Sequence, residues 1–169
     1  MPNAQVLQAR VKTEHPQTGI RAHDAKTLAA GLSRSLAETY VLYLKTQGFH
    51  WNVVGPLFYG LHKLTEDQYR DLAGATDALA ERVRALGHPA PATFAEFLGL
   101  SAVRESSGRH SAEDMVSELV ADHETVARTF RELVEVADKA RDVVSADLLT
   151  DRIHFHEQAA WMLRSIAAR

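Results

Sequence analysis

The chain contains no cysteine, and this absence excludes several kinds of chemistry at once. Without thiols it can form no disulfide, no thiolate metal site and no cysteine nucleophile. It also lacks any uncharged apolar run of about 18 residues, so no transmembrane helix is predicted. The N-terminus has no basic region followed by an apolar stretch, so no secretory signal is predicted either. We therefore expect a soluble, cytoplasmic protein with no membrane partner.

An excess of positive charge is also missing. The formal net charge is −3, which argues against a generally basic surface for nucleic acid. Hydrophobic residues make up 46% and charged residues 24% of the chain, as in ordinary globular proteins. Its 169 residues are enough for one domain with a real core.

Strand-like alternation and internal repeats are absent too, whereas apolar residues recur at helical spacing in four long segments. The pattern predicts an all-α bundle of four long helices over residues 24–169, after a flexible N-terminal tail of residues 1–23. Asp24 is the expected N-cap of the first helix, which should end near Asn52. The second helix should run from about Pro56 to Leu86.

The connection between the second and third helices, residues 87–110, is longer than the usual helix–helix loop. A short helix, Thr93 to Leu98, is expected inside it. Ser111 and Asp114 form an acidic capping box that should start the third helix. Such a long connection favours a crossover along the bundle, as in ferritin-like folds.

Five side chains along the first two helices are candidate metal ligands. Two imidazoles and three carboxylates suit iron(II), manganese or zinc. Two of the pairs lie four residues apart, so each pair occupies one face of a helix. The five residues are His50, His62, Glu66, Asp77 and Glu81.

One chain cannot close all five ligands around one metal. The fifteen residues from His62 to Asp77 rise roughly 22 Å along a helix, whereas a metal–ligand bond is about 2 Å. Both i,i+4 pairs nevertheless face much the same side of the helix. The economical solution is two antiparallel copies of the helix meeting across a twofold axis, with two equivalent sites per dimer.

Each signal also has a plain structural reading. His62 and Glu66 could be a surface pair, and the like-charge pair of Asp77 and Glu81 repels by a few tenths of a kcal/mol unless a cation offsets it. His123 and His156 lie on apolar stripes and are predicted to be hydrogen-bonded core histidines. Trp161 is predicted to pack in the core, and Trp51 to lie beside the site or simply to pack.

Several motifs resemble the signature of the Dps family, the miniferritins that protect DNA in starved cells. The first runs from Phe49-His50-Trp51-Asn52 to Phe58 and continues at Leu61-His62. The others are Asp77-Ala78-Leu79-Ala80-Glu81-Arg82 with Gly87, and the segment from His156 to Arg164. Together they cover most of residues 24–168.

The resemblance implies a hollow dodecamer that oxidises iron(II) with peroxide or dioxygen and stores the iron(III) product. It implies sites shared by twofold-related subunits, in which His50, His62 and Glu66 come from one subunit and Asp77 and Glu81 from its partner. Position 66 is often aspartate in the family, and the longer glutamate arm could shift the second metal. Other divalent metals could bind there too. The chain lacks the Glu-x-x-His motifs of ferritins proper, which speaks against a di-iron centre inside one bundle.

Two further regions carry weaker signals. Asp142, Asp147 and Asp151 begin the last helix, where acidic residues complement the helix dipole, and the resemblance implies that they line a pore that admits iron. Arg10, Lys12 and Arg21 are candidate DNA contacts in the tail, which twelve copies would strengthen by multivalency. The rival function is a nucleoid-associated, DNA-compacting protein with incidental metal binding, and a third reading is a merely structural helical oligomer.

Overall fold

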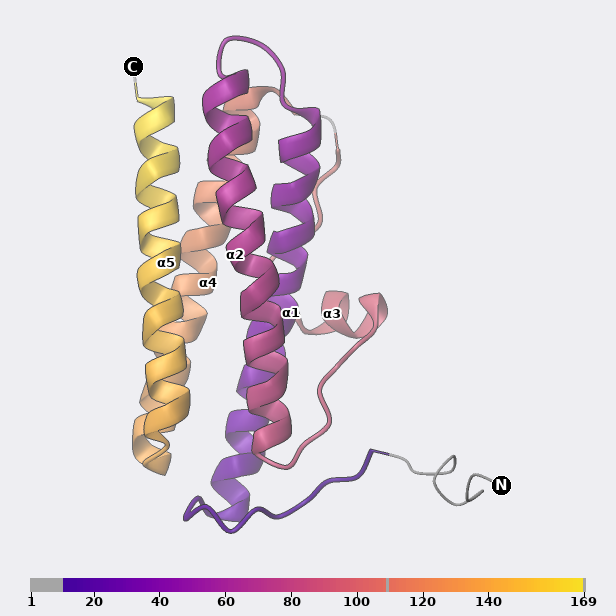
Figure 1. Cartoon of the computed structure of the whole chain (residues 1–169), viewed down its shortest axis with the longest axis vertical. Helices are drawn as coiled ribbons and strands as arrows, with labels where there is room; N and C mark the ends of the chain where they lie inside the picture. Colours follow the sequence, from indigo (N-terminus) through magenta and orange to yellow (C-terminus); the bar gives the residue numbers. More distant parts are fainter. Residues whose placement is uncertain (1–10, 109, 169) are drawn as a thin grey trace, which may run out of the picture.

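Four long helices and one short helix make up the fold, and the described residues contain no strand (Figure 1). The structure is a computed structural model that describes residues 11–108 and 110–168. No helix within these ranges is long and apolar enough to cross a membrane. The helices are α1 (Ala22–Asn52), α2 (Phe58–Ala85), α3 (Phe94–Leu100), α4 (Ala112–Ala140) and α5 (Val143–Ala167). The predicted all-α bundle with a short helix in the long connection is confirmed.

The core is made by the apolar stripes of the four long helices. Helix α1 packs against α2 and α4, and α4 packs along α5. At Gly31 the side chain of Leu133 from α4 packs directly on α1, and a Cβ at this position would clash with it. Leucines form much of the fully buried interior, among them Leu28, Leu32, Leu42, Leu61, Leu72, Leu79, Leu119, Leu149 and Leu163.

The helix ends follow the sequence signals with one exception. The capping box of Ser111 and Asp114 is present at the start of α4, and Thr93 caps α3 in the same way. Asp24, however, is not the N-cap of α1, because the helix begins at Ala22 after Arg21. The Asp24 carboxylate instead lies 2.6 Å from Nε of Arg21.

The crossover carries α3 to the side of α1 (Figure 1). Phe97 is the buried residue of this short helix, and its ring stacks on Tyr40 of α1 at a centroid distance of 4.6 Å. One aromatic anchor therefore holds the long connection against the bundle.

The segment before α1 is partly seated on the bundle. The backbone N–H of Glu14 donates a hydrogen bond to the carbonyl of Gly87 at 2.7 Å. Gly87 has φ +88°, and a Cβ there would clash with the carbonyl oxygen of Glu14. Glycine is therefore required twice, for its backbone angle and for the contact. Residues 11–21 are irregular, and from Glu14 onward the segment contacts the end of α2.

Candidate metal centre

The turn between α1 and α2 brings His50 and His62 into direct contact. Their rings stack at a centroid distance of 3.8 Å with an interplanar angle of 15°. His50 lies in the last turn of α1 and His62 in the second turn of α2. Both side chains are partly exposed, so atoms of another molecule can reach the pair.

Each of these two histidines binds the backbone of the other. Nδ1 of His50 lies 2.8 Å from the carbonyl oxygen of His62, and Nδ1 of His62 lies 2.9 Å from that of His50. A carbonyl oxygen only accepts, so both Nδ1 atoms must carry a hydrogen. In the neutral rings both Nε2 atoms then keep a free lone pair, the form that ligates a metal.

Aromatic rings fix the pair from two sides. Tyr69 meets His50 edge-on at a centroid distance of 5.1 Å, and Phe58 stacks on His62 at 5.1 Å. The sequence analysis missed both residues. Their positions four before and seven after His62 put them on its face of α2, and that spacing was the available signal.

Glu66 follows His62 by one turn and is held by two cations of its own helix. Its carboxylate lies 2.8 Å from Nζ of Lys63 and 2.6 Å from Arg70. The hydrogen bond from Lys63 lowers the pKa of Glu66, and the charge of Arg70 acts in the same direction. Glu66 is thus an ionised carboxylate that would have to exchange these partners to bind a metal.

Asp77 and Glu81 lie exposed in the same unbroken helix, away from the histidine pair. Fifteen residues of continuous α2 separate His62 from Asp77, roughly 22 Å along the axis. Within residues 11–108 and 110–168, no three His, Asp or Glu side chains converge on one metal position. The structure therefore brings His50 and His62 together, with Glu66 one turn away, whereas Asp77 and Glu81 lie apart from them on α2.

The predicted core histidines are confirmed. His123 and His156 are fully buried, and their Nδ1 atoms lie 2.9 Å apart. Burial lowers the pKa of His123 to about 3 and that of His156 well below its ordinary value. The prediction for Trp161 was wrong, because it is 58% exposed. Its position on α5 faces outward, which the apolar character of the side chain did not reveal.

Comparison with known proteins identifies the family. The ferritin-like domain family matches residues 29–169. An uncharacterized low temperature-induced protein of Nostoc is 44% identical over 136 residues, which cover 79% of this chain and 76% of the relative. A DNA protection during starvation protein of Brevibacillus brevis is 38% identical, with 82% and 93% covered. The chain belongs to the Dps family of ferritin-like proteins.

A solved Dps structure from Vibrio cholerae O1 is described as a member of a broad superfamily of ferritin-like diiron-carboxylate proteins. It has a TM-score of 0.85 to this chain at 28% identity, with 93% of this chain and 97% of the other covered. Membership of this superfamily fits iron binding by a set of imidazoles and carboxylates.

The three aspartates assigned to a Dps-type pore are not equivalent. Asp142 is buried, and both its oxygens accept hydrogen bonds from Arg82, at 2.6 and 2.7 Å. Burial raises the pKa of Asp142, but the hydrogen bonds from Arg82 and Ser145 outweigh it and lower the pKa overall. Within the subunit Asp142 is thus the N-cap of α5, with its oxygens engaged.

Asp147 and Asp151 remain exposed on α5. They line an open cavity of about 540 Å³ between α2 and α5, together with Glu81 and Arg82. The two candidate pore residues therefore share a groove with one of the candidate ligands.

The candidate DNA contacts of the tail also differ from one another. Lys12 is exposed. The Arg21 side chain is 79% exposed but paired with Asp24. Arg10 lies outside the described residues.

Proposed function

We propose that this Dps protein forms a dodecameric cage that oxidises iron(II), stores the iron(III) product and thereby protects DNA in the cytoplasm. The observation that carries the proposal is the His50–His62 pair, because both Nε2 atoms are left as ligands by a tautomer that the backbone fixes. The ferritin-like fold and the Dps relatives support the choice of iron as the substrate.

The complete site would combine two subunits. His50, His62 and Glu66 would come from one subunit, and Asp77 and Glu81 of the partner subunit would complete the ligand set. The unbroken α2 supports this arrangement, since one helix cannot bring both groups to one metal. Two equivalent sites would then form across each twofold axis.

The ligands also suit the chemistry. Imidazoles and carboxylates bind iron(II), and carboxylates favour the harder iron(III) product. Two irons oxidised together deliver two electrons to peroxide or dioxygen, so peroxide is reduced without release of hydroxyl radical. Asp147 and Asp151 would attract the incoming cations electrostatically.

Complementation in mixed particles tests the shared site. His62→Asn keeps a hydrogen-bond donor near the Nδ1 position but removes the ligand, whereas Glu81→Gln removes the carboxylate with little change of shape. Each variant alone should assemble but oxidise iron slowly. Random mixing should restore about a quarter of the native sites, because half of the dimers are mixed and each has one intact site. Confirmed mixed particles that stay inactive would show that the site is not shared.

Direct DNA contact through the tails is a separate part of the proposal. The exposed Lys12 is the observation that favours it, and binding by a few cations per tail should weaken steeply with salt. A gel shift at low and near-physiological salt, with the native chain and with Lys12→Gln, measures this. Iron oxidation by the Lys12→Gln particle should remain unchanged, since Lys12 is no ligand of the proposed site. DNA binding that persists at high salt without iron oxidation would favour the rival DNA-compacting function.

A further inference from the structure

Three of the four tyrosines of the chain form one continuous row. Tyr69 of α2 meets His50 at a centroid distance of 5.1 Å and Tyr43 of α1 at 6.4 Å. Tyr43 meets Tyr40, one turn further along α1, at 5.8 Å. Each of these distances is within the range of contacting aromatic pairs. The row therefore begins at the candidate metal centre and leads away from it along α1.

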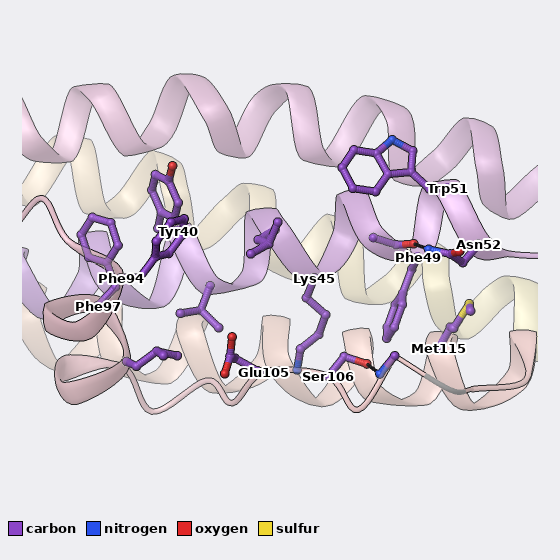
Figure 2. A pocket seen from close by; sticks show the side chains of 15 residues that line it. Tyr40, Lys45, Phe49, Trp51, Asn52, Phe94, Phe97, Glu105, Ser106 and Met115 are labelled. Carbon is purple, nitrogen blue, oxygen red and sulfur yellow. Dashed lines mark hydrogen bonds between the residues drawn. The ribbon is translucent and has the colours of Figure 1, made fainter.

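The far end of the row opens into a cavity. Tyr40 lines a cavity of about 290 Å³ between α1, α3 and the connection that follows α3. Figure 2 shows Tyr40 near Phe94 and Phe97 at one end of this cavity and Trp51 at the other. A small solute in the cavity can thus approach the last tyrosine of the row.

The phenol side chain of tyrosine can be oxidised by one electron, a property that is not needed for packing. A phenol gives up one electron and one proton far more readily than a phenylalanine ring, and it regains both from a reductant. Tyr40, Tyr43 and Tyr69 are each only partly buried, so water has access to their surroundings as a proton acceptor. Phenylalanine would fill the same space without this property.

We propose that Tyr69, Tyr43 and Tyr40 form an electron-donor chain that serves the oxidation site when only one iron(II) is bound. The inference rests on the proposed function, because that reaction supplies the iron(II) and the peroxide. One iron(II) provides one electron, whereas reduction of peroxide to water and hydroxide needs two. Tyr69 supplies the second electron, so that iron(II), the Tyr69 phenol and peroxide give iron(III), a Tyr69 phenoxyl radical, water and hydroxide.

The radical then moves from Tyr69 toward the cavity, one tyrosine at a time. The phenoxyl of Tyr69 takes an electron and a proton from Tyr43, and Tyr43 takes them from Tyr40. At the cavity, an ene-diol reductant of the ascorbate type returns a hydrogen atom to Tyr40. These steps keep hydroxyl radical from forming at a site that holds one iron(II), because that iron supplies only one of the two electrons that peroxide needs.

Conservative variants separate this chain from simple packing. Assembled particles receive one iron(II) per site and then peroxide, and are freeze-quenched for electron paramagnetic resonance. The native particle should give a tyrosyl radical, and Tyr69→Phe should lose most of this signal. Tyr59→Phe is the matched control, because Tyr59 lies on the same helix but is 74% exposed and outside the row. In Tyr40→Phe, the radical should form but decay more slowly when ascorbate is added.

Iron oxidation with two irons per site is measured in parallel and should be unchanged in Tyr40→Phe and in the control Tyr59→Phe. An unchanged radical in Tyr69→Phe, or a signal that Trp51→Phe abolishes instead, would overturn the chain while leaving the proposed function intact. A native particle that does not oxidise iron would refute the proposed function, and this inference with it.

Discussion

Acidification should weaken each subunit through the buried pair of His123 and His156. Both imidazoles are held uncharged by burial, so protonation strongly disfavours the native state. In the unfolded chain the same groups take up protons near the ordinary histidine pKa. The unfolded state therefore binds more protons, and the free energy of unfolding falls as the pH drops below that value.

The size of the effect follows from the pKa of His123. It is lowered from 6.5 to about 3, so its contribution is complete above pH 6.5 and is lost progressively down to about pH 3. At pH 4.5, about two units below the unfolded value, the loss relative to neutral pH is about 3 kcal/mol. The lowered pKa of His156 likewise reduces the free energy of unfolding as the pH falls.

His123→Asn tests this reasoning. The asparagine amide can still bond Nδ1 of His156, but it does not titrate in this range. Urea unfolding at pH 6.5, 5.5 and 4.5 and fixed subunit concentration gives the free energy of unfolding for the native chain and the variant. The variant should be less stable at pH 6.5, because a smaller side chain leaves a cavity. Its further loss between pH 6.5 and 4.5 should be smaller than the native loss by about 2 kcal/mol, because at pH 6.5 the histidine of the unfolded chain is already half protonated.

Phe130→Leu is the control for a cavity alone. The Phe130 ring packs against His156 at a centroid distance of 5.5 Å and carries no charge. This variant should lower stability at every pH without changing the pH dependence. If His123→Asn shows the native pH dependence, the buried pair does not control the acid stability of the fold.

Three further variants test other features. Arg82→Leu removes the ion-pair partner of the buried Asp142 and should lower the free energy of unfolding in urea by about 3–5 kcal/mol. Adding Asp142→Asn should recover part of this loss. A loss below about 1 kcal/mol in Arg82→Leu would show that the ion pair is dispensable. Gly87→Ala forces a left-handed backbone angle, at a cost of about 1–2 kcal/mol, and pushes against the carbonyl of Glu14. Limited proteolysis before α1 should therefore become faster, and an unchanged rate would mean that this contact does not hold the segment. A Cβ at Gly74 would meet no atom within 4 Å among the described residues of its own subunit, so a leucine there would project from α2 without disturbing the fold. Gly74→Leu should therefore block the proposed antiparallel dimer, and light scattering should give a smaller particle. An unchanged particle mass would show that this part of α2 is not in the interface.

The sequence predicted the elements well because its local signals are strong. The capping box at Ser111 and the glycine at position 87 fixed helix ends that the structure contains. The prediction for Asp24 was wrong because an acidic residue in a first turn resembles an N-cap, and the choice between them depends on the backbone of Arg21. The prediction for Trp161 was wrong because one apolar side chain does not reveal the direction of a helix face.

At the candidate site, the sequence pointed to candidate ligands but to few of the contacts that surround them. The resemblance to Dps placed His50 and His62 in the same half of the candidate site, yet no pattern predicts that each ring binds the backbone of the other. Lys63 and Arg70 flank Glu66 at ordinary helical spacings, so that ion pairing could have been foreseen. The row of tyrosines required the structure, because Tyr69 comes from α2 and meets α1 only in the folded bundle.

The histidine pair also has a consequence for the order of folding events. Only twelve residues separate His50 from His62, and one short turn between two helices joins them. Contacts so close in sequence form early, because little chain entropy opposes them. Subunit association is slower and depends on concentration. A newly made subunit would thus hold half of the proposed site at once and gain the other half only on assembly, so that iron oxidation would begin only when assembly brings the partner's carboxylates into place.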